Sequence, residues 1–213
     1  MPENLHKLFV ISSPSGGGKT SLINKLFEDS RSANFEKSIS DTSRQKRQGD
    51  LEGKDYYFLS EKDFKDKIKK EEYVEYATVF GNFYGTSKEE IKTKYNNSNL
   101  ILELDWQGAY AVKEIFDDAK LIFLVPPSLD DLKQRLIKRN LDSSEAIESR
   151  LSEAKKEISK SEMYDYLVLN DDFDKAFEDL SQILFEGISP IDFNSRASKD
   201  LSLIHISEPT RRV

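Results

Sequence analysis

The chain has no cysteine, only two histidines (His6 and His205), and no apolar run near the roughly 20 residues that a membrane helix needs. Without cysteine there can be no disulfide, thiol nucleophile or cysteine zinc site. The histidines lie near opposite ends, which argues against histidine-based catalysis. Residues 1–4 lack the basic and apolar regions of a signal peptide, so we expect a cytoplasmic protein with no membrane partner.

Length and charge narrow the class further. A chain of 213 residues is long enough for one core with an inserted lobe, or for two small domains. Its net charge of −7 argues against nucleic-acid binding. Arg44, Lys46 and Arg47 nevertheless form a local basic cluster, which is either a solvated surface turn or a site for a small anion. We expect a small, phosphorylated partner. The sequence does not indicate an oligomeric state.

An apolar run at 8–11 leads into the sequence SSPSGGGKT at 12–20, which predicts a strand, a phosphate loop and the start of a helix. Glycines let backbone N–H groups approach a phosphate closely, and a helix beginning at Lys19 directs its positive dipole end at the anion. Lys19 can reach the terminal phosphates, and the Thr20 hydroxyl can ligate Mg²⁺. The strict motif has glycine where this chain has Ser13, so an ordinary glycine-rich turn is the alternative. Triple glycine followed by Lys-Thr in this context favours nucleotide binding.

The rest of the chain reads as an α/β protein. Helical spacing follows the loop as far as about Ser30, and residues 36–97 resemble short strands with one helix, which we interpret as an inserted lobe. Ser60 is the predicted N-cap of that helix, and Gly81-Asn82 predicts a hairpin-like break. Near the end of the chain, Phe173 begins the apolar stripe of a closing helix that ends at Gly187. Further strands and helices are predicted at 99–105, 121–125, 128–139, 144–158, 166–170 and 173–187. Beyond Pro190 the periodicity vanishes, and 202–213 resembles the translation of a cloning adaptor more than a structural element.

Several charged residues have two interpretations. Asp105 ends a buried strand, where α/β proteins bind ligands, or it caps the following helix. Glu103 lies inside an apolar run and must find a partner or a ligand. Arg135 and Arg139 are four residues apart and share a helix face, and Arg150 follows on the next helix. Solvated surface positions are the alternative for all three arginines.

With these motifs in view, the chain resembles the guanylate kinase family over roughly residues 7–187. The resemblance rests on PSGGGKT at 14–20, SDTSR at 40–44, GKDYYF at 53–58, GNFYGT at 81–86, LDWQG at 104–108 and NDD at 170–172. It implies a P-loop NTPase-type parallel sheet flanked by helices, with an inserted mixed α/β GMP-binding lobe and a helical lid. The implied boundaries within 1–187 are a core at about 5–35, 98–127 and 163–187, a lobe at about 36–97 and a lid at about 128–160. Residues 188–213 are left unassigned.

The resemblance also implies roles for individual residues, in the transfer of the ATP γ-phosphoryl group to GMP with Mg²⁺. The ATP site would comprise Ser13, Pro14, Ser15, Gly16, Gly17, Gly18, Lys19, Thr20, Ser21, Arg139 and Asn170. The GMP phosphate would be held by Ser40, Arg44, Arg47, Tyr56 and Tyr84, and guanine would be read by Glu75, Thr86 and Glu103. Asp105 would lie near the acceptor phosphate and ligate the metal with Thr20. Catalysis would depend on Lys19, Arg44, Arg135, Arg139 and Arg150.

The chain departs from the family pattern in two places: Ser13 replaces Gly or Ala, and Gln45-Lys46 stands where the basic loop carries proline. Neither change removes a chemical group. Two rival functions remain, a non-catalytic guanylate-kinase-like interaction module and a kinase for another monophosphate. Glu75 also has a rival interpretation, as an exposed strand residue. Phosphoryl transfer needs positioning and cationic groups more than covalent chemistry, so no covalent intermediate is expected.

Overall fold

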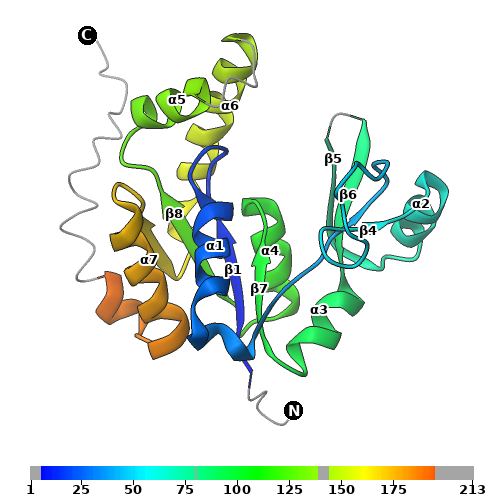
Figure 1. Ribbon diagram of the computed structural model, residues 1–213, viewed down its shortest axis with the longest axis horizontal. Coiled ribbons are helices and arrows are strands. Elements are labelled where there is room, and N and C mark those ends of the chain that lie inside the picture. The colour runs from blue at the N-terminus through cyan, green and yellow to red at the C-terminus, as the bar shows by residue number, and fades with distance from the viewer. Residues whose placement is uncertain (1–5, 80, 139–143, 195–213) are drawn as a thin grey trace. The chain divides into compact units, whose positions relative to one another are not determined.

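The computed structural model describes residues 6–79, 81–138 and 144–194 (Figure 1). Contacts divide the chain into two compact units. The first unit comprises Met1–Val10 and Asn34–Lys120, and the second comprises Ile11–Ala33 and Leu121–Val213. Across the described residues, no helix is both long and apolar enough to cross a membrane.

The main sheet has five parallel strands in the order β2-β7-β1-β8-β9. Their bounds are β1 (Leu8–Ser12), β2 (Phe35–Lys37), β7 (Asn99–Glu103), β8 (Lys120–Val125) and β9 (Tyr166–Leu169). All five residues of β1 are buried, as expected for a parallel strand covered on both faces. The predicted α/β class is therefore confirmed.

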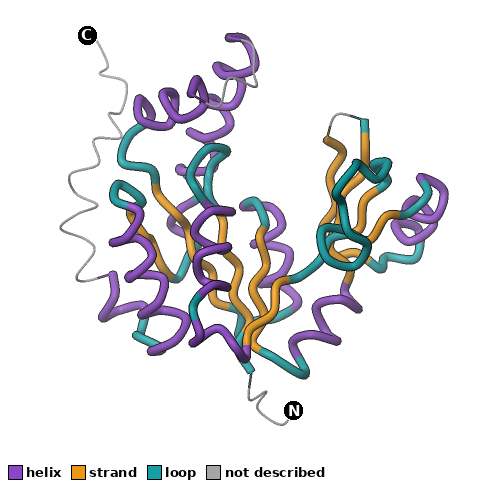
Figure 2. The backbone as a smooth tube through the Cα atoms, in the orientation of Figure 1, coloured by secondary structure: helices purple, strands orange, loops and turns teal. Residues whose placement is uncertain are grey.

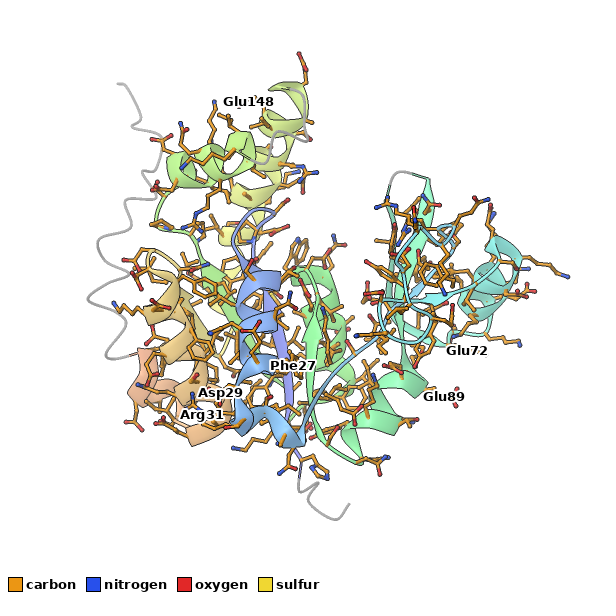
Figure 3. All side chains as sticks on the ribbon, in the orientation of Figure 1. Phe27, Asp29, Arg31, Glu72, Glu89 and Glu148 are labelled. Atoms are coloured by element: carbon orange, nitrogen blue, oxygen red, sulfur yellow. The ribbon has the colours of Figure 1, made fainter. Side chains whose placement is uncertain are left out.

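The α-helices of the second unit include α1 (Lys19–Glu28), α5 (Leu129–Lys138), α6 (Ser144–Ile158) and α7 (Phe173–Ser181), the last continued by a π-helical turn at Gln182–Glu186. α1 and α7 lie side by side (Figure 1). Just beyond α1, the Arg31 guanidinium donates to both carboxylate oxygens of Asp29 (Figure 3) and lies 4.8 Å from the Phe185 ring centroid. α5 and α6 pack together through the buried side chains of Leu132, Leu136, Ile147, Leu151 and Ala154.

The first unit contains a second, mixed sheet in the order β4-β3-β6-β5. Its strands are β3 (Asp41–Thr42), β4 (Tyr57–Phe58), β5 (Tyr73–Val79) and β6 (Asn82–Ser87), and the helices of this unit are α2 (Glu61–Lys69), α3 (Lys88–Tyr95) and α4 (Trp106–Ile115). β5 and β6 form the predicted antiparallel hairpin, with Gly81 at φ +77° in its turn.

Helix α2 flanks this mixed sheet (Figure 2). The predicted cap at its start is confirmed, because the Ser60 hydroxyl accepts the Asp63 N–H at 3.0 Å. Its end is a Schellman turn in which the N–H groups of Glu71 and Glu72 bond back to the carbonyls of Ile68 and Lys67. Glu71 takes the left-handed position of that turn at φ +55°, where glycine is usual.

Three sequence predictions need correction. Residues 36–97 contain two helices rather than the single predicted one. The second helix, α3, was missed because only two of its residues, Ile91 and Tyr95, are buried apolar positions. Phe173 was assigned to a buried stripe but is exposed. The core was predicted to be complete at Gly187, but residues 190–194 add a further helical turn. This turn buries Phe193 against the Tyr166 ring.

Candidate functional site

The phosphate loop leaves β1 and enters α1 as its sequence predicts. The Gly17 N–H donates to the Pro14 carbonyl at 2.8 Å, and a Cβ at Gly17 would lie 2.9 Å from that same oxygen. Gly18 has φ +91° and occupies the N-cap of α1, where it has no side chain to cap the helix. The N-terminus of α1 is therefore built to face an anion.

The other predicted ATP-site residues follow from this path. Lys19, Thr20 and Ser21 form the first turn of α1, with Lys19 half-buried and the other two exposed. Ser13, which replaces the usual small residue, is buried, and its hydroxyl donates to the Pro14 carbonyl at 3.2 Å. The hydroxyl thus has a local partner.

Side chains from the same unit support the loop. Asn170 is buried, and its amide nitrogen donates to the Gly17 carbonyl at 2.6 Å. Arg135 donates to the Asn170 carbonyl at 2.9 Å, and Arg150 donates to the Ser15 hydroxyl at 3.0 Å. The two arginines are thus hydrogen-bonded to the loop and to the residue that supports it. The alternative interpretation, in which they are solvated surface residues without such contacts, does not hold for them. Arg139 lies outside the described residues.

Two of the three predicted guanine readers, Glu75 and Thr86, meet on the mixed sheet of the first unit, whereas Glu103 ends β7 of the main sheet. Glu75 of β5 pairs with Thr86 of β6, and the Thr86 side chain hydrogen-bonds its carboxylate. The Ser40 hydroxyl lies 3.4 Å from the Thr86 hydroxyl. Burial raises the pKa of Glu75, and the charge of Asp105 adds to that effect. Glu75 is therefore not the ordinary exposed strand residue that its sequence allowed.

Arg44 packs against aromatic side chains. Its guanidinium carbon is 5.5 Å from the ring centroids of both Tyr56 and Phe58, and the Tyr56 and Tyr84 rings meet edge-to-face at 5.7 Å. Its charge pairs with Asp50 at 2.9 Å. Burial alone would lower the pKa of Arg44, but the hydrogen bond and charge of Asp50 outweigh it and raise that pKa.

Asp50 is a residue that the sequence interpretation missed. Its carboxylate also accepts the Arg47 N–H at 2.8 Å, which closes the loop that carries both predicted phosphate-binding arginines. The Arg47 N–H, reinforced by Arg44, lowers the pKa of Asp50. An acid three residues after Arg47, next to Gly49, was the available signal for such a turn.

The two carboxylates near the end of β7 differ in their surroundings. Glu103 pairs with Lys37 of β2 at 2.7 Å, so it found the partner that a carboxylate in an apolar run requires. Asp105 is the N-cap of α4 and accepts the Gly108 N–H at 2.9 Å. The cap interpretation of Asp105 is therefore confirmed, and a ligand role would be additional to it.

Together, a parallel sheet with a phosphate loop at a helix N-terminus, and a separate mixed sheet with clustered cationic and aromatic groups, define a P-loop phosphotransferase. A family model described as guanylate kinase matches residues 5–187. A guanylate kinase from Wolbachia sp. subsp. Brugia malayi (strain TRS) is 45% identical over 184 residues, covering 85% of this chain and 93% of that protein. One from Hahella chejuensis (strain KCTC 2396) is 47% identical over 178 residues, covering 83% and 85%.

A solved structure agrees with these relatives. The crystal structure of guanylate kinase from Anaplasma phagocytophilum is similar with a TM-score of 0.66 and 35% identity, and the match covers 88% of each chain. The chain belongs to the guanylate kinase family. It is a nucleoside monophosphate kinase that transfers a phosphoryl group from ATP to GMP and forms GDP.

Proposed function

We propose that the phosphate loop at 12–20 binds the phosphates of ATP, with Lys19 placed against the group that is transferred. The observation that carries this proposal is the N-terminus of α1, where Gly18 supplies no capping side chain. The positive end of the helix dipole would attract a bound anion there. Arg135 and Arg150, both bonded to the loop or its support, would add positive charge to stabilise the transition state. Arg139 is proposed for the same role on the resemblance alone.

The first unit would bind GMP. Ser40, Arg44, Arg47, Tyr56 and Tyr84 are the proposed ligands of its phosphate, and Glu75, Thr86 and Glu103 are the proposed readers of guanine. In support, Arg44 is a largely buried cation that pairs with the anion Asp50. A phosphate is also an anion, and it could bind Arg44 beside Asp50 or in its place. Glu75 is a partly buried acceptor, which suits the two adjacent N–H donors of guanine.

Mg²⁺ is the proposed metal, with Thr20 and Asp105 as its protein ligands. Among residues 6–79, 81–138 and 144–194, no group of three or more acidic or histidine side chains is arranged to hold a metal. This fits Mg²⁺, which usually takes only one or two protein ligands and completes its shell with water and substrate phosphates. When bound, the metal would neutralise charge on the phosphates.

The protein groups would act by position and charge. No residue at the site needs to become a nucleophile, because the GMP phosphate itself attacks the transferred group. Lys19 and the arginines would stabilise the charge that develops on the three equatorial oxygens. Exclusion of water by the bound substrates would prevent hydrolysis of ATP. We propose a cytoplasmic location, where both nucleotides are present.

The test is GDP formation from ATP and GMP by the purified chain, with and without a chelator of divalent metals. The Lys19→Ala variant should lose more than about two orders of magnitude in rate while keeping its melting temperature. Lys25→Ala is the matched control, since Lys25 is an exposed lysine of the same helix paired only at 3.6 Å with Glu28. Near-full activity of Lys19→Ala, or undiminished activity in the chelator, would refute the proposed site.

A further inference from the structure

Three side chains outside the proposed substrate contacts, two of them buried and one half-buried, form a cluster in the first unit. Asp41 of β3 is 4% exposed, and one of its carboxylate oxygens accepts both the Lys67 ammonium at 2.5 Å and the Tyr73 hydroxyl at 2.7 Å. Lys67 comes from α2, and Tyr73 begins β5. The cluster therefore joins a strand, a helix and a second strand at one oxygen atom.

A carboxylate in this position needs an explanation, because burying an ionised group is costly unless it is paired. Asp41 has two donors, the Lys67 ammonium and the Tyr73 hydroxyl. Burial, together with the Asp41 carboxylate, raises the pKa of Tyr73, so that its hydroxyl stays protonated and donates. Replacing a buried ion pair by apolar side chains is often neutral for stability, so stability alone does not account for the cluster.

Strand β3 supplies that explanation, because it is only two residues long. Asp41 pairs with Tyr57 of β4 and Gly85 of β6, and the ladder ends one residue later. Backbone bonds to Ser40, Thr42 and Ser43 hold its edges to β4 and β6, so the side chain of Asp41 adds an attachment to a different element. The side chain of Asp41 attaches β3 from the face that meets α2, where Lys67 is located.

Residues on either side of Asp41 belong to the proposed phosphate site. Alternate side chains of a strand point to opposite faces, so Ser40 and Thr42 face away from Lys67 and Tyr73. The Thr42 hydroxyl accepts the Arg44 N–H at 3.1 Å. A shift of β3 would therefore move Ser40 and the backbone of Arg44 together.

The cluster is not needed to attach α2 to the sheet. The Phe64 ring of α2 is fully buried and stacks on the rings of Tyr73 at 4.5 Å and Phe83 at 5.3 Å. These contacts would remain if Lys67 or the Tyr73 hydroxyl were removed. Removal would free the Asp41 side chain and so loosen β3 on the side that meets α2, while its backbone bonds to β4 and β6 remain.

We propose that Lys67 and Tyr73 are positioning residues that hold Asp41 and thereby fix β3 for binding of the GMP phosphate. The proposal rests on the proposed function, in which Ser40 and Arg44 contact that phosphate. If only a fraction of molecules hold β3 in place, the apparent affinity for GMP falls by that fraction. Binding of ATP in the second unit and the rate at saturating GMP do not depend on it.

The test compares steady-state constants for Tyr73→Phe and Lys67→Met with those of the wild type, at a temperature where melting curves show every variant folded. Tyr73→Phe removes one oxygen and should raise KM for GMP about 3- to 10-fold. Lys67→Met should raise it about 5- to 30-fold, because a charged partner is lost. In both variants, kcat and KM for ATP should stay within about twofold, and Lys67→Arg should recover most of the loss.

Lys69→Met is the matched control, since Lys69 is an exposed lysine of the same helix paired with Asp66 at 3.0 Å. Its KM for GMP should equal that of the wild type. Unchanged KM for GMP in Tyr73→Phe and Lys67→Met, or equal increases for both substrates, would overturn the proposal. A wild type that does not phosphorylate GMP, or an Arg44→Ala variant with unchanged KM for GMP, would instead refute the proposed function.

Discussion

Replacing Glu75 by glutamine removes a charge from the proposed guanine site with little change of shape. The side chain is held in place by its hydrogen bond from Thr86 and by the close approach of Gly108, where a Cβ added to the glycine would lie 3.1 Å from the Glu75 Cγ. Glutamine has the same length and nearly the same volume. Glu75→Gln therefore tests the carboxylate rather than the packing.

The expected loss follows from the donors that guanine presents. A carboxylate accepts N1–H and the C2 amino group side by side, and each bond to a charged group contributes about 1.5 to 3 kcal/mol. Glutamine keeps one acceptor, its carbonyl oxygen, but its NH₂ group would face the second N–H donor of guanine, where no hydrogen bond can form. A net loss of about 2 to 4 kcal/mol corresponds to a roughly 30- to 700-fold decrease in kcat/KM for GMP.

The same substitution should have the opposite effect on the free protein. Burial raises the pKa of Glu75 above its ordinary value of 4.5, so ionisation of this group opposes folding. The stability that is present below that value is lost as pH rises through the folded-state pKa. Glu75→Gln should therefore melt at a higher temperature than the wild type at pH 7, and the difference should shrink as pH falls below the ordinary value.

The assay measures kcat and KM for GMP and ATP together with thermal melting of the nucleotide-free protein at several pH values. Glu89→Gln is the matched control, because Glu89 is an exposed glutamate of α3 in the same unit (Figure 3). That control should change neither property. Wild-type kinetics for GMP in Glu75→Gln, or an equal loss in Glu89→Gln, would refute the reasoning.

Three further predictions concern the loop, the end of α2 and the arginines. Gly18→Ala should destabilise the protein by about 1 to 3 kcal/mol in urea unfolding, because φ is +91° and the new Cβ would lie 2.5 Å from the Asn170 amide nitrogen; an unchanged midpoint would contradict this. Glu71→Gly should stabilise it by about 0.5 to 1 kcal/mol, since φ is +55° there, and a lower midpoint would show that the strain is compensated. Arg44→Ala should mainly raise KM for GMP, whereas Arg150→Ala should mainly lower kcat; identical kinetic profiles would exclude this division.

The sequence predicted the features that depend on neighbouring residues. The strand, loop and helix at 8–28 need only an apolar run, three glycines and a helix start, all contiguous. The Ser60 cap and the hairpin at Gly81 are equally local. The α/β class and the family followed from such motifs and were confirmed, whereas α3 was missed because its apolar stripe is too sparse to show helical periodicity.

The partners of the charged residues could not be predicted, because they depend on tertiary contacts. Asp41 and Lys67 are 26 positions apart, and Lys37 and Glu103 are 66 apart. No spacing rule links residues at such separations. The roles assigned to individual substrate-binding residues therefore remain predictions, although the structure gives the neighbours that each role would use.

The decisive measurement is the rate of phosphoryl transfer from ATP to GMP, AMP, CMP and UMP under one set of conditions, with the nucleoside diphosphate and ADP quantified separately. A site that reads guanine through a partly buried carboxylate leaves that carboxylate without its two base donors against adenine, and such sites discriminate by about 10⁴ or more in kcat/KM. We expect GDP and ADP in equal amounts from GMP, and kcat/KM for AMP lower by about that factor. Comparable kcat/KM values for AMP and GMP, or release of ADP without GDP, would contradict the assignment.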